Sequence, residues 1–159
     1  MKVLGIDPGT RILGWCVVDG DRRTQKFIAG GIYRVGAKKS ERGLLKIYNA
    51  VSELIEKFSP DILVLESPFF GMNAHTLIRL GEARGAILVA GSHREIPVES
   101  VSPAEAKLAL TGNGNATKEQ VAYMVQNILK PDTELPIDAS DAAAVAIAFL
   151  HKTTLGKRN

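Results

Sequence analysis

Four acidic residues stand apart from the polar helix faces and turns that hold most of the others. Asp7 and Glu66 each close an apolar, strand-like run, "VLGID" and "ILVLE". Asp138 and Asp141 lie three residues apart in "DASDAAAVAIAFL", so they share one face of a helix. If the two strands are neighbours in a sheet, Asp7 and Glu66 meet at its edge. The small alanines let the helix pack close enough to add its own pair.

Such a cluster predicts a metal site. Carboxylates that share one place repel one another, and a bound divalent cation, or two, relieves the repulsion. The histidines His75, His93 and His151 are scattered, which disfavours zinc. Ligation by oxygen alone favours Mg²⁺, with Mn²⁺ able to substitute. Two such ions roughly 3.5–4 Å apart can activate a water and stabilise the leaving oxygen of a phosphodiester.

Each acid taken alone has a simpler interpretation. Asp138 is explained equally well as the N-cap of its helix. Glu66 is explained as the residue at which a buried strand becomes exposed to solvent. After Asp7, the residues Pro8 and Gly9 predict a tight turn in which Gly9 is free to adopt positive φ. Asp7 then only caps that turn, or the turn's N–H groups cradle a phosphate. The metal site is predicted from the four acids taken together.

Length and composition fit a single domain spanning 1–159, with 45% hydrophobic residues to fill its core. No apolar run reaches membrane-spanning length, no signal segment opens the chain, and Cys16 is the only cysteine, so we expect a cytoplasmic protein. A net charge of +3 and a pI of about 9.1 permit a polyanionic partner without requiring one. The tail from about residue 152 is basic, and its order is left open.

The hydrophobic pattern predicts the elements that position the acids. Strands are expected at 2–7, 11–19, 25–34, 61–67 and 96–101, and helices at 41–58, 73–91, from 102, from 117 and at 138–150. Asn73 is a plausible N-cap, and Ser102 and Thr117 each begin a capping box. Three hairpin-linked strands followed by βα units predict an α/β fold, a mixed five-stranded sheet with helices on both faces.

Motifs along the whole chain resemble the RuvC family of Holliday-junction resolvases, which are crossover junction endodeoxyribonucleases. They are "GIDPGT" at 5–10, "LES" at 65–67 with "FFGMN" after it, "LGEARG" at 80–85 and "DASDAAAVAIA" at 138–148. The resemblance implies a ribonuclease H-like fold and a homodimer that nicks two strands of a four-way junction using Mg²⁺, two ions per site. It also implies a role in homologous recombination and DNA repair, with the RuvAB branch-migration complex as a partner.

The resemblance also assigns residues by position. The chain's counterparts of the family's metal-binding acids are Asp7, Glu66, Asp138 and Asp141. Lys107 and Lys118 fall where the family keeps basic residues that support catalysis and DNA binding. Phe69 falls where an aromatic residue stacks near the junction centre, and an exposed aromatic there can stack on unpaired bases.

The chain departs from the family pattern at three places. Ser67-Pro68 stands where relatives often have a polar residue and then valine, and Met72 where lysine is common. The shape of the loop that carries Phe69, and one phosphate contact, are therefore left open. Some relatives end the acid set with histidine, where this chain has Asp141.

Three further questions stay open from the sequence. Gly81 and Gly85 on one helix fit either a dimer face, with Leu77, Leu80 and Ile87 nearby, or close packing on the chain's own sheet. An ATP-handling domain of the actin and sugar-kinase type also begins with a strand like "GIDPGT", but it needs a second domain. A catalytically idle DNA-binding module is the other alternative, and the four intact acids argue against it.

Overall fold

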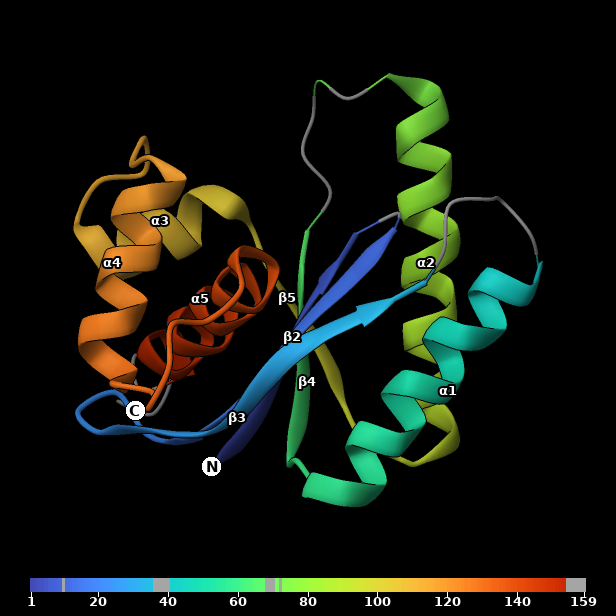
Figure 1. Cartoon of the computed structure of the whole chain (residues 1–159), viewed down its shortest axis with the longest axis horizontal. Coiled ribbons are helices and arrows are strands. Elements are labelled where there is room, and N and C mark those ends of the chain that lie inside the picture. Colours follow the sequence, from blue (N-terminus) through green and yellow to red (C-terminus); the bar gives the residue numbers. More distant parts are fainter. Residues whose placement is uncertain (10, 36–40, 68–70, 72, 154–159) are drawn as a thin grey trace, which may run out of the picture.

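The computed structural model describes residues 1–9, 11–35, 41–67, 71 and 73–153 (Figure 1). Its elements are β1 (Lys2–Pro8), β2 (Ile12–Gly20), β3 (Gln25–Arg34), α1 (Glu41–Phe58), β4 (Ile62–Glu66), α2 (Ala74–His93), β5 (Val98–Val101), α3 (Pro103–Thr111), α4 (Lys118–Leu129) and α5 (Ile137–Thr153). This is the predicted order, with ends that differ by a few residues at most. Phe69, Pro68 and Met72 lie outside the described residues, as does the basic tail after Thr153.

One five-stranded sheet, in the order β3-β2-β1-β4-β5, forms the middle layer. Strand β1 pairs antiparallel with β2 and parallel with β4, β2 pairs antiparallel with β3, and β4 pairs parallel with β5. Helices α1 and α2 cover one face, and α3, α4 and α5 lie on the other (Figure 1). The predicted mixed sheet with helices on both faces is confirmed.

The two faces of the sheet bury separate cores, because successive side chains of a strand point to opposite faces. Leu4 and Ile6 of β1 pack with α1 and α2, whereas Val3 packs with α5. Asp7 is four residues after Val3, so its side chain lies on the same face of the sheet and faces α5. Cys16 is fully buried, and burial raises the pKa of its thiol to about 12, as expected for a core residue.

The predicted helix starts at Asn73, Ser102 and Thr117 are all confirmed. The Asn73 side chain accepts from the Thr76 N–H, and Ser102 and Thr117 each form a complete capping box. These caps define where α3 and α4 begin, and hence where the lysines on those helices lie.

The turn after β1 differs from the predicted one. The positive-φ glycines of the described chain are Gly20, Gly71 and Gly112, and Gly9 is not among them. The Gly9 N–H instead donates to the Asp7 carbonyl at 3.0 Å. A Cβ at Gly9 would lie 2.1 Å from the Ile12 carbonyl oxygen, so glycine is needed here for close approach and not for a left-handed backbone.

Helix α2 corrects a second expectation. Ile87 is fully buried between the helix and the sheet, so it does not share an outward face with Gly81 and Gly85. The close approach of α2 to the sheet occurs at Gly91, where a Cβ would lie 2.8 Å from Val98 Cγ2. Within the described ranges, no helix combines the length and apolar character needed to cross a membrane.

Candidate active site

Neighbouring parallel strands bring Asp7 and Glu66 to one edge of the sheet. Ile6 of β1 is in register with Leu65 of β4, and each acid follows one residue later. Glu66 also pairs with Val101 of β5, so its strand is flanked on both sides. Both acids are partly buried at the carboxyl ends of central strands, as predicted.

Helix α5 reaches this edge because two glycines leave room for its backbone. A Cβ at Gly5 would lie 2.0 Å from the Ala142 carbonyl oxygen, and one at Gly14 would lie 2.1 Å from that of Asp138. The helix meets them with alanines that are fully buried: Ala139, Ala142, Ala143 and Ala146. The alanines were recognised in the sequence, but the glycines were missed. The sequence does contain a signal for them, because a glycine inside a strand often marks a place where another backbone comes close.

The start of α5 presents Asp138 and Asp141 to the strand ends. The helix begins at Ile137, so Asp138 lies in its first turn and is not the N-cap. Ser140, between the two acids, is buried and its N–H donates to the Pro136 carbonyl at 2.9 Å. Asp138 and Asp141 themselves remain partly exposed, one helical turn apart.

The four acids act on one another electrostatically. The pKa of Asp7 is raised to about 7, first by burial and then by the charges of Glu66, Asp141 and Asp138, in that order of size. Burial also raises the pKa of Glu66, and Asp141 adds to the effect. The carboxylates of β1, β4 and α5 are thus close enough to interact, and the charged forms of the two strand-end acids, Asp7 and Glu66, are disfavoured.

Two lysines from neighbouring helices offset part of this repulsion. Lys118 Nζ donates to Asp141 Oδ2 at 2.9 Å, and this hydrogen bond is the main reason that the pKa of Lys118 is raised. The Lys118 side chain is 69% exposed and that of Asp141 18%, so the lysine remains open to solvent above the acid. Lys118 lowers the pKa of both Asp7 and Glu66, and Lys107 lowers that of Glu66.

Oxygen is the only donor type in this cluster, which fits a hard divalent cation. Within the described ranges, no three Asp, Glu, His or Cys side chains converge as a finished metal cage. Asp141 is held by Lys118 instead. Glu66, Asp138 and Asp141 therefore lie within electrostatic reach of Asp7 without converging on one point.

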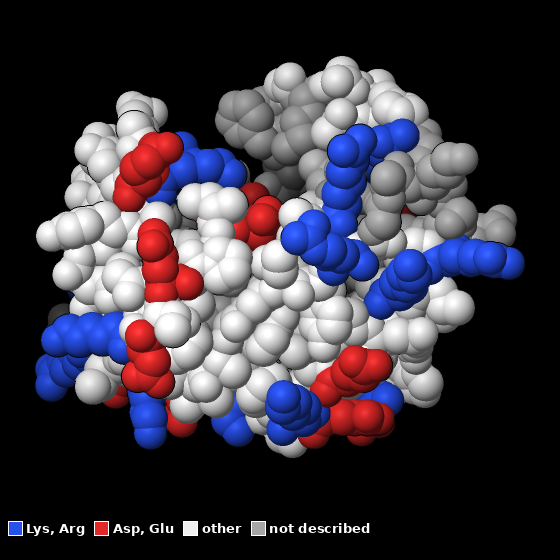
Figure 2. All heavy atoms as spheres, viewed as in Figure 1, with Lys and Arg blue, Asp and Glu red and all other residues white. Residues whose placement is uncertain are grey.

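The space-filling view shows how open the site is. Acidic side chains lie near the centre of this face, in a hollow, with basic side chains to either side of it (Figure 2). An extended anion crossing this face would pass over the hollow and meet positive charge on both sides. The expected aromatic contact of Phe69 belongs to a residue outside the described ranges.

Comparisons with known proteins agree with this arrangement. The family model "Crossover junction endodeoxyribonuclease RuvC" matches residues 3–149. Proteins of that name from Shewanella woodyi and Christiangramia forsetii are each 39% identical to the chain, covering 94% and 98% of it and 86% and 83% of their own lengths. The structure titled "T. thermophilus RuvC in complex with Holliday junction substrate" matches with a TM-score of 0.91 at 31% identity, over 98% of this chain and 96% of its own. The chain belongs to the RuvC family of crossover junction endodeoxyribonucleases.

Proposed function

We propose that this protein resolves four-way DNA junctions by metal-dependent hydrolysis of one phosphodiester in each of two strands, in homologous recombination and DNA repair. The observation that carries the proposal is the electrostatic coupling of Asp7 with the other three acids, beside Lys118, which acts on Asp7 and Glu66, and Lys107, which acts on Glu66. A site of that kind, at the base of a hollow flanked by positive charge, suits cleavage of a polyanion.

Asp7, Glu66, Asp138 and Asp141 are the proposed ligands of Mg²⁺, two ions per site, with Mn²⁺ able to substitute. Such ions, when bound, supply an activated water and stabilise the leaving oxygen of the cleaved bond. Asp7 lies at the end of β1, which is paired with β2 on one side and β4 on the other, so the sheet fixes its position. Asp138 and Asp141 share one helical turn and adjust together with α5.

Lys107 and Lys118 are the proposed phosphate contacts next to the cut. Lys118 is mostly exposed and bonded to Asp141, so it can transfer its hydrogen bonds to a phosphate oxygen when Asp141 turns toward a cation. Lys107 lowers the pKa of Glu66, so it acts on the β4 side of the site. Together they place positive charge over the site from α3 and α4.

A homodimer is the proposed assembly, because a four-way junction has two-fold symmetry and resolving it needs two cuts. Helix α2 offers the face. A Cβ at Gly81 or Gly85 would meet nothing within 4 Å in the described chain, so these glycines do not pack on the chain's own sheet. The exposed apolar residues around them are Leu77 (45%), Ile78 (61%), Leu88 (39%) and Val89 (59%). A stable interface there should bury about 1,200–2,000 Å² in total.

Three further parts of the proposal come from the family resemblance. Phe69 stacks on a base near the junction centre, and the RuvAB branch-migration complex delivers the junction. The cytoplasm, where chromosomal DNA is available, is the proposed location. An ATP-handling domain is not favoured, because the family match spans residues 3–149 and belongs to endonucleases.

A labelled synthetic four-way junction tests the proposal, with a linear duplex of the same sequence as the control substrate. We expect cuts in two strands of the junction with Mg²⁺, none with EDTA, and none on the duplex under the same conditions. Asp7→Asn should bind the junction and leave it uncut, since the change removes a ligand charge and almost no volume. Equal cutting of the duplex, or normal cutting by Asp7→Asn, would contradict the proposal.

A further inference from the structure

The end of strand β3 lies at the same edge of the sheet as the four acids. Strand β3 is antiparallel to β2, which is antiparallel to β1, so β1 and β3 run in the same direction. Asp7 is in register with Gly14, and Gly14 with Ile32. Arg34 follows two residues further along β3, opposite Ile12. The last residue of this edge strand therefore lies just beyond the row that contains Asp7.

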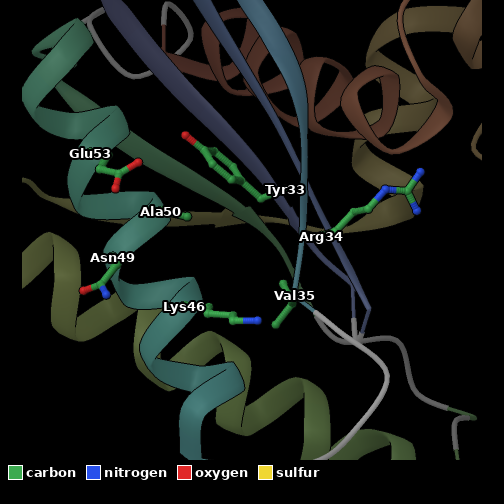
Figure 3. Close-up of a pocket in the computed structure, with 7 residues that line it drawn as sticks. All are labelled: Tyr33, Arg34, Val35, Lys46, Asn49, Ala50 and Glu53. Atoms are coloured by element: carbon green, nitrogen blue, oxygen red, sulfur yellow. The ribbon is translucent and has the colours of Figure 1, made fainter.

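Arg34 also faces the same side of the sheet as the four acids. Its neighbour Tyr33 faces α1, where burial and contact with Glu53 raise the pKa of its hydroxyl. Because successive strand residues point to opposite faces, Arg34 faces the α5 side. Figure 3 shows Tyr33 and Glu53 directed toward each other and Arg34 directed away from them across the strand.

The charge of Arg34 is free to act on an external group. Arg34 is exposed, and within the described ranges its side chain has no hydrogen bond or ion pair. The cations that lower the pKa of Asp7 and Glu66 are Lys118 and Lys107, so Arg34 is not used to neutralise the acids. An arginine held on a strand and left unpaired is well suited to bind phosphate.

Two more exposed cations lie beside Arg34. The Val35 N–H donates to the Arg11 carbonyl at 2.9 Å, which ties the start of β2 to the end of β3. Arg11 therefore lies next to Arg34 at the sheet edge. Lys46 of α1 lines, with Tyr33, Arg34 and Val35, a cavity of about 230 Å³ on the α1 side of the strand, so it lies on the face of the sheet away from the acids. Neither cation forms a side-chain ion pair within the described part of the chain.

The separation from the acids suits a neighbouring stretch of DNA backbone. Two strand spacings of about 4.8 Å and two residue rises of about 3.3 Å place the Cα atoms of Arg34 and Asp7 roughly 12 Å apart. Successive phosphates of one DNA strand advance about 3.4 Å along the duplex axis. Because successive phosphates also turn about that axis, they lie further apart in space than this rise, so a phosphate on Arg34 is within a few nucleotides of one held at the acids.

We propose that Arg34, with Arg11 beside it, forms a basic ridge that binds the phosphates of a junction arm beside the cleavage site. Lys107 and Lys118 approach the acids from α3 and α4, whereas the ridge lies across β1 from them, at the β3 edge (Figure 1). The arm is thus held on both sides of the scissile bond, which sets its direction over the four acids. This inference rests on the proposed function and extends it to the path of the DNA.

The matched comparison uses two exposed cations of the same strand. Arg34→Ala removes one at the acid end of β3, and Lys26→Ala removes one at the far end, opposite Asp19. Junction affinity is measured without divalent metal at several salt concentrations. We expect Arg34→Ala to weaken binding about 3–10-fold and to make the slope of log K against log salt shallower by about one unit. Lys26→Ala should change neither, and Arg34→Lys should retain most of the affinity.

Neutral methylphosphonates placed singly at each of the first eight positions from the cut locate the contact. One position, within a few nucleotides of the cut, should weaken binding of the wild type and have no effect on Arg34→Ala. The ridge would be overturned if Arg34→Ala and Lys26→Ala bound the junction with the same affinity and the same salt dependence. It would also be overturned if every methylphosphonate position that weakens binding of the wild type also weakened binding of Arg34→Ala. Cutting by the wild type is scored separately: its absence would contradict the proposed function, and the binding comparison would still decide the ridge.

Discussion

Lys118 Nζ lies 2.9 Å from Asp141 Oδ2, so one of the four acids is already paired with a lysine from another helix. The pair joins Lys118, the first residue of α4, to Asp141, near the start of α5. With Asp141 as a metal ligand, as proposed, a cation must compete with Lys118 for its carboxylate. The same displacement leaves the lysine free to contact a phosphate, so metal loading and DNA binding are expected to support each other.

Replacement of Lys118 by alanine should therefore separate metal binding from cutting. Without the competing ammonium, the acids carry more net negative charge, and we expect Mg²⁺ or Mn²⁺ to bind the free protein a few-fold more tightly by calorimetry. Junction cleavage should fall at least tenfold, because the phosphate contact is lost. Lys152→Ala is the control, since Lys152 pairs with Glu105 and has a comparable exposure of 63%. Weaker metal binding in Lys118→Ala would contradict this account.

The stability of the metal-free protein should fall as the pH rises toward 8. The pKa of Asp7 is about 7 in the folded chain against an ordinary 3.8, so folding favours its protonated form. That contribution is fully present below about pH 4 and is lost as the pH rises through 7. At about 1.4 kcal/mol for each pKa unit, the loss is at most about 4 kcal/mol.

Thermal unfolding at pH 5 and pH 8 in EDTA measures this effect. Asp7→Asn should remove much of the difference between the two pH values, and Mg²⁺ should restore stability to the wild type at pH 8. Asp132→Asn, at an exposed position of the linker before α5, should leave the wild-type pH dependence unchanged. A wild type that is more stable at pH 8 than at pH 5 in EDTA would refute the coupling of the acids.

Gly14→Ala tests how α5 is seated on the sheet. The added Cβ would lie 2.1 Å from the Asp138 carbonyl oxygen, so the helix must move away from β2. We expect a loss of roughly 1–3 kcal/mol in the free energy of unfolding, together with weaker metal binding as Asp138 shifts. Gly114→Ala, whose Cβ would meet only Ala104 O at 3.7 Å, is the control. Unchanged stability and metal affinity in Gly14→Ala would contradict the proposed seating.

Much of the fold, and the placing of Asp7 and Glu66 at strand ends, could be predicted from the local sequence pattern. Asp7 and Glu66 end apolar runs, and Ser102 and Thr117 carry complete capping signatures, so strand ends and helix starts could be placed before the structure was known. Asp138 could not be distinguished from an N-cap, because helix boundaries depend on the packing of the whole element. The structure separates the two interpretations by starting α5 at Ile137.

Features that depend on two distant segments could be predicted only in part. Gly5 and Gly14 inside strands indicate that some backbone comes close, but the local pattern does not say that this backbone is α5, more than a hundred residues later in the chain. Ile87 was assigned to the wrong side of α2, because helical spacing alone does not fix which apolar stripe faces the sheet. The pairing of Lys118 with Asp141 likewise needs two helices to be packed before it exists.

The α2 face can now be tested with a variant that should not disturb the monomer. Gly85→Leu adds a large side chain where the described chain leaves open space, so the circular dichroism spectrum should remain that of the wild type. Sedimentation at micromolar concentration should show the variant shifted from dimer to monomer. Leu108→Lys changes a residue that is 58% exposed on α3, across the sheet, and should leave the dimer intact. A wild type that is monomeric with and without the junction would contradict the α2 dimer.

The most direct measurement of the central claim is cleavage of a supercoiled plasmid that carries a cruciform. Two cuts within one binding event give linear plasmid, whereas a single nick relaxes the plasmid, reabsorbs the cruciform and gives an open circle. With the four acids as a metal site in each half of a dimer, we predict linear product with Mg²⁺, and none with EDTA or with Asp7→Asn. Open circles alone, or an equal linear yield from Asp7→Asn, would contradict the account.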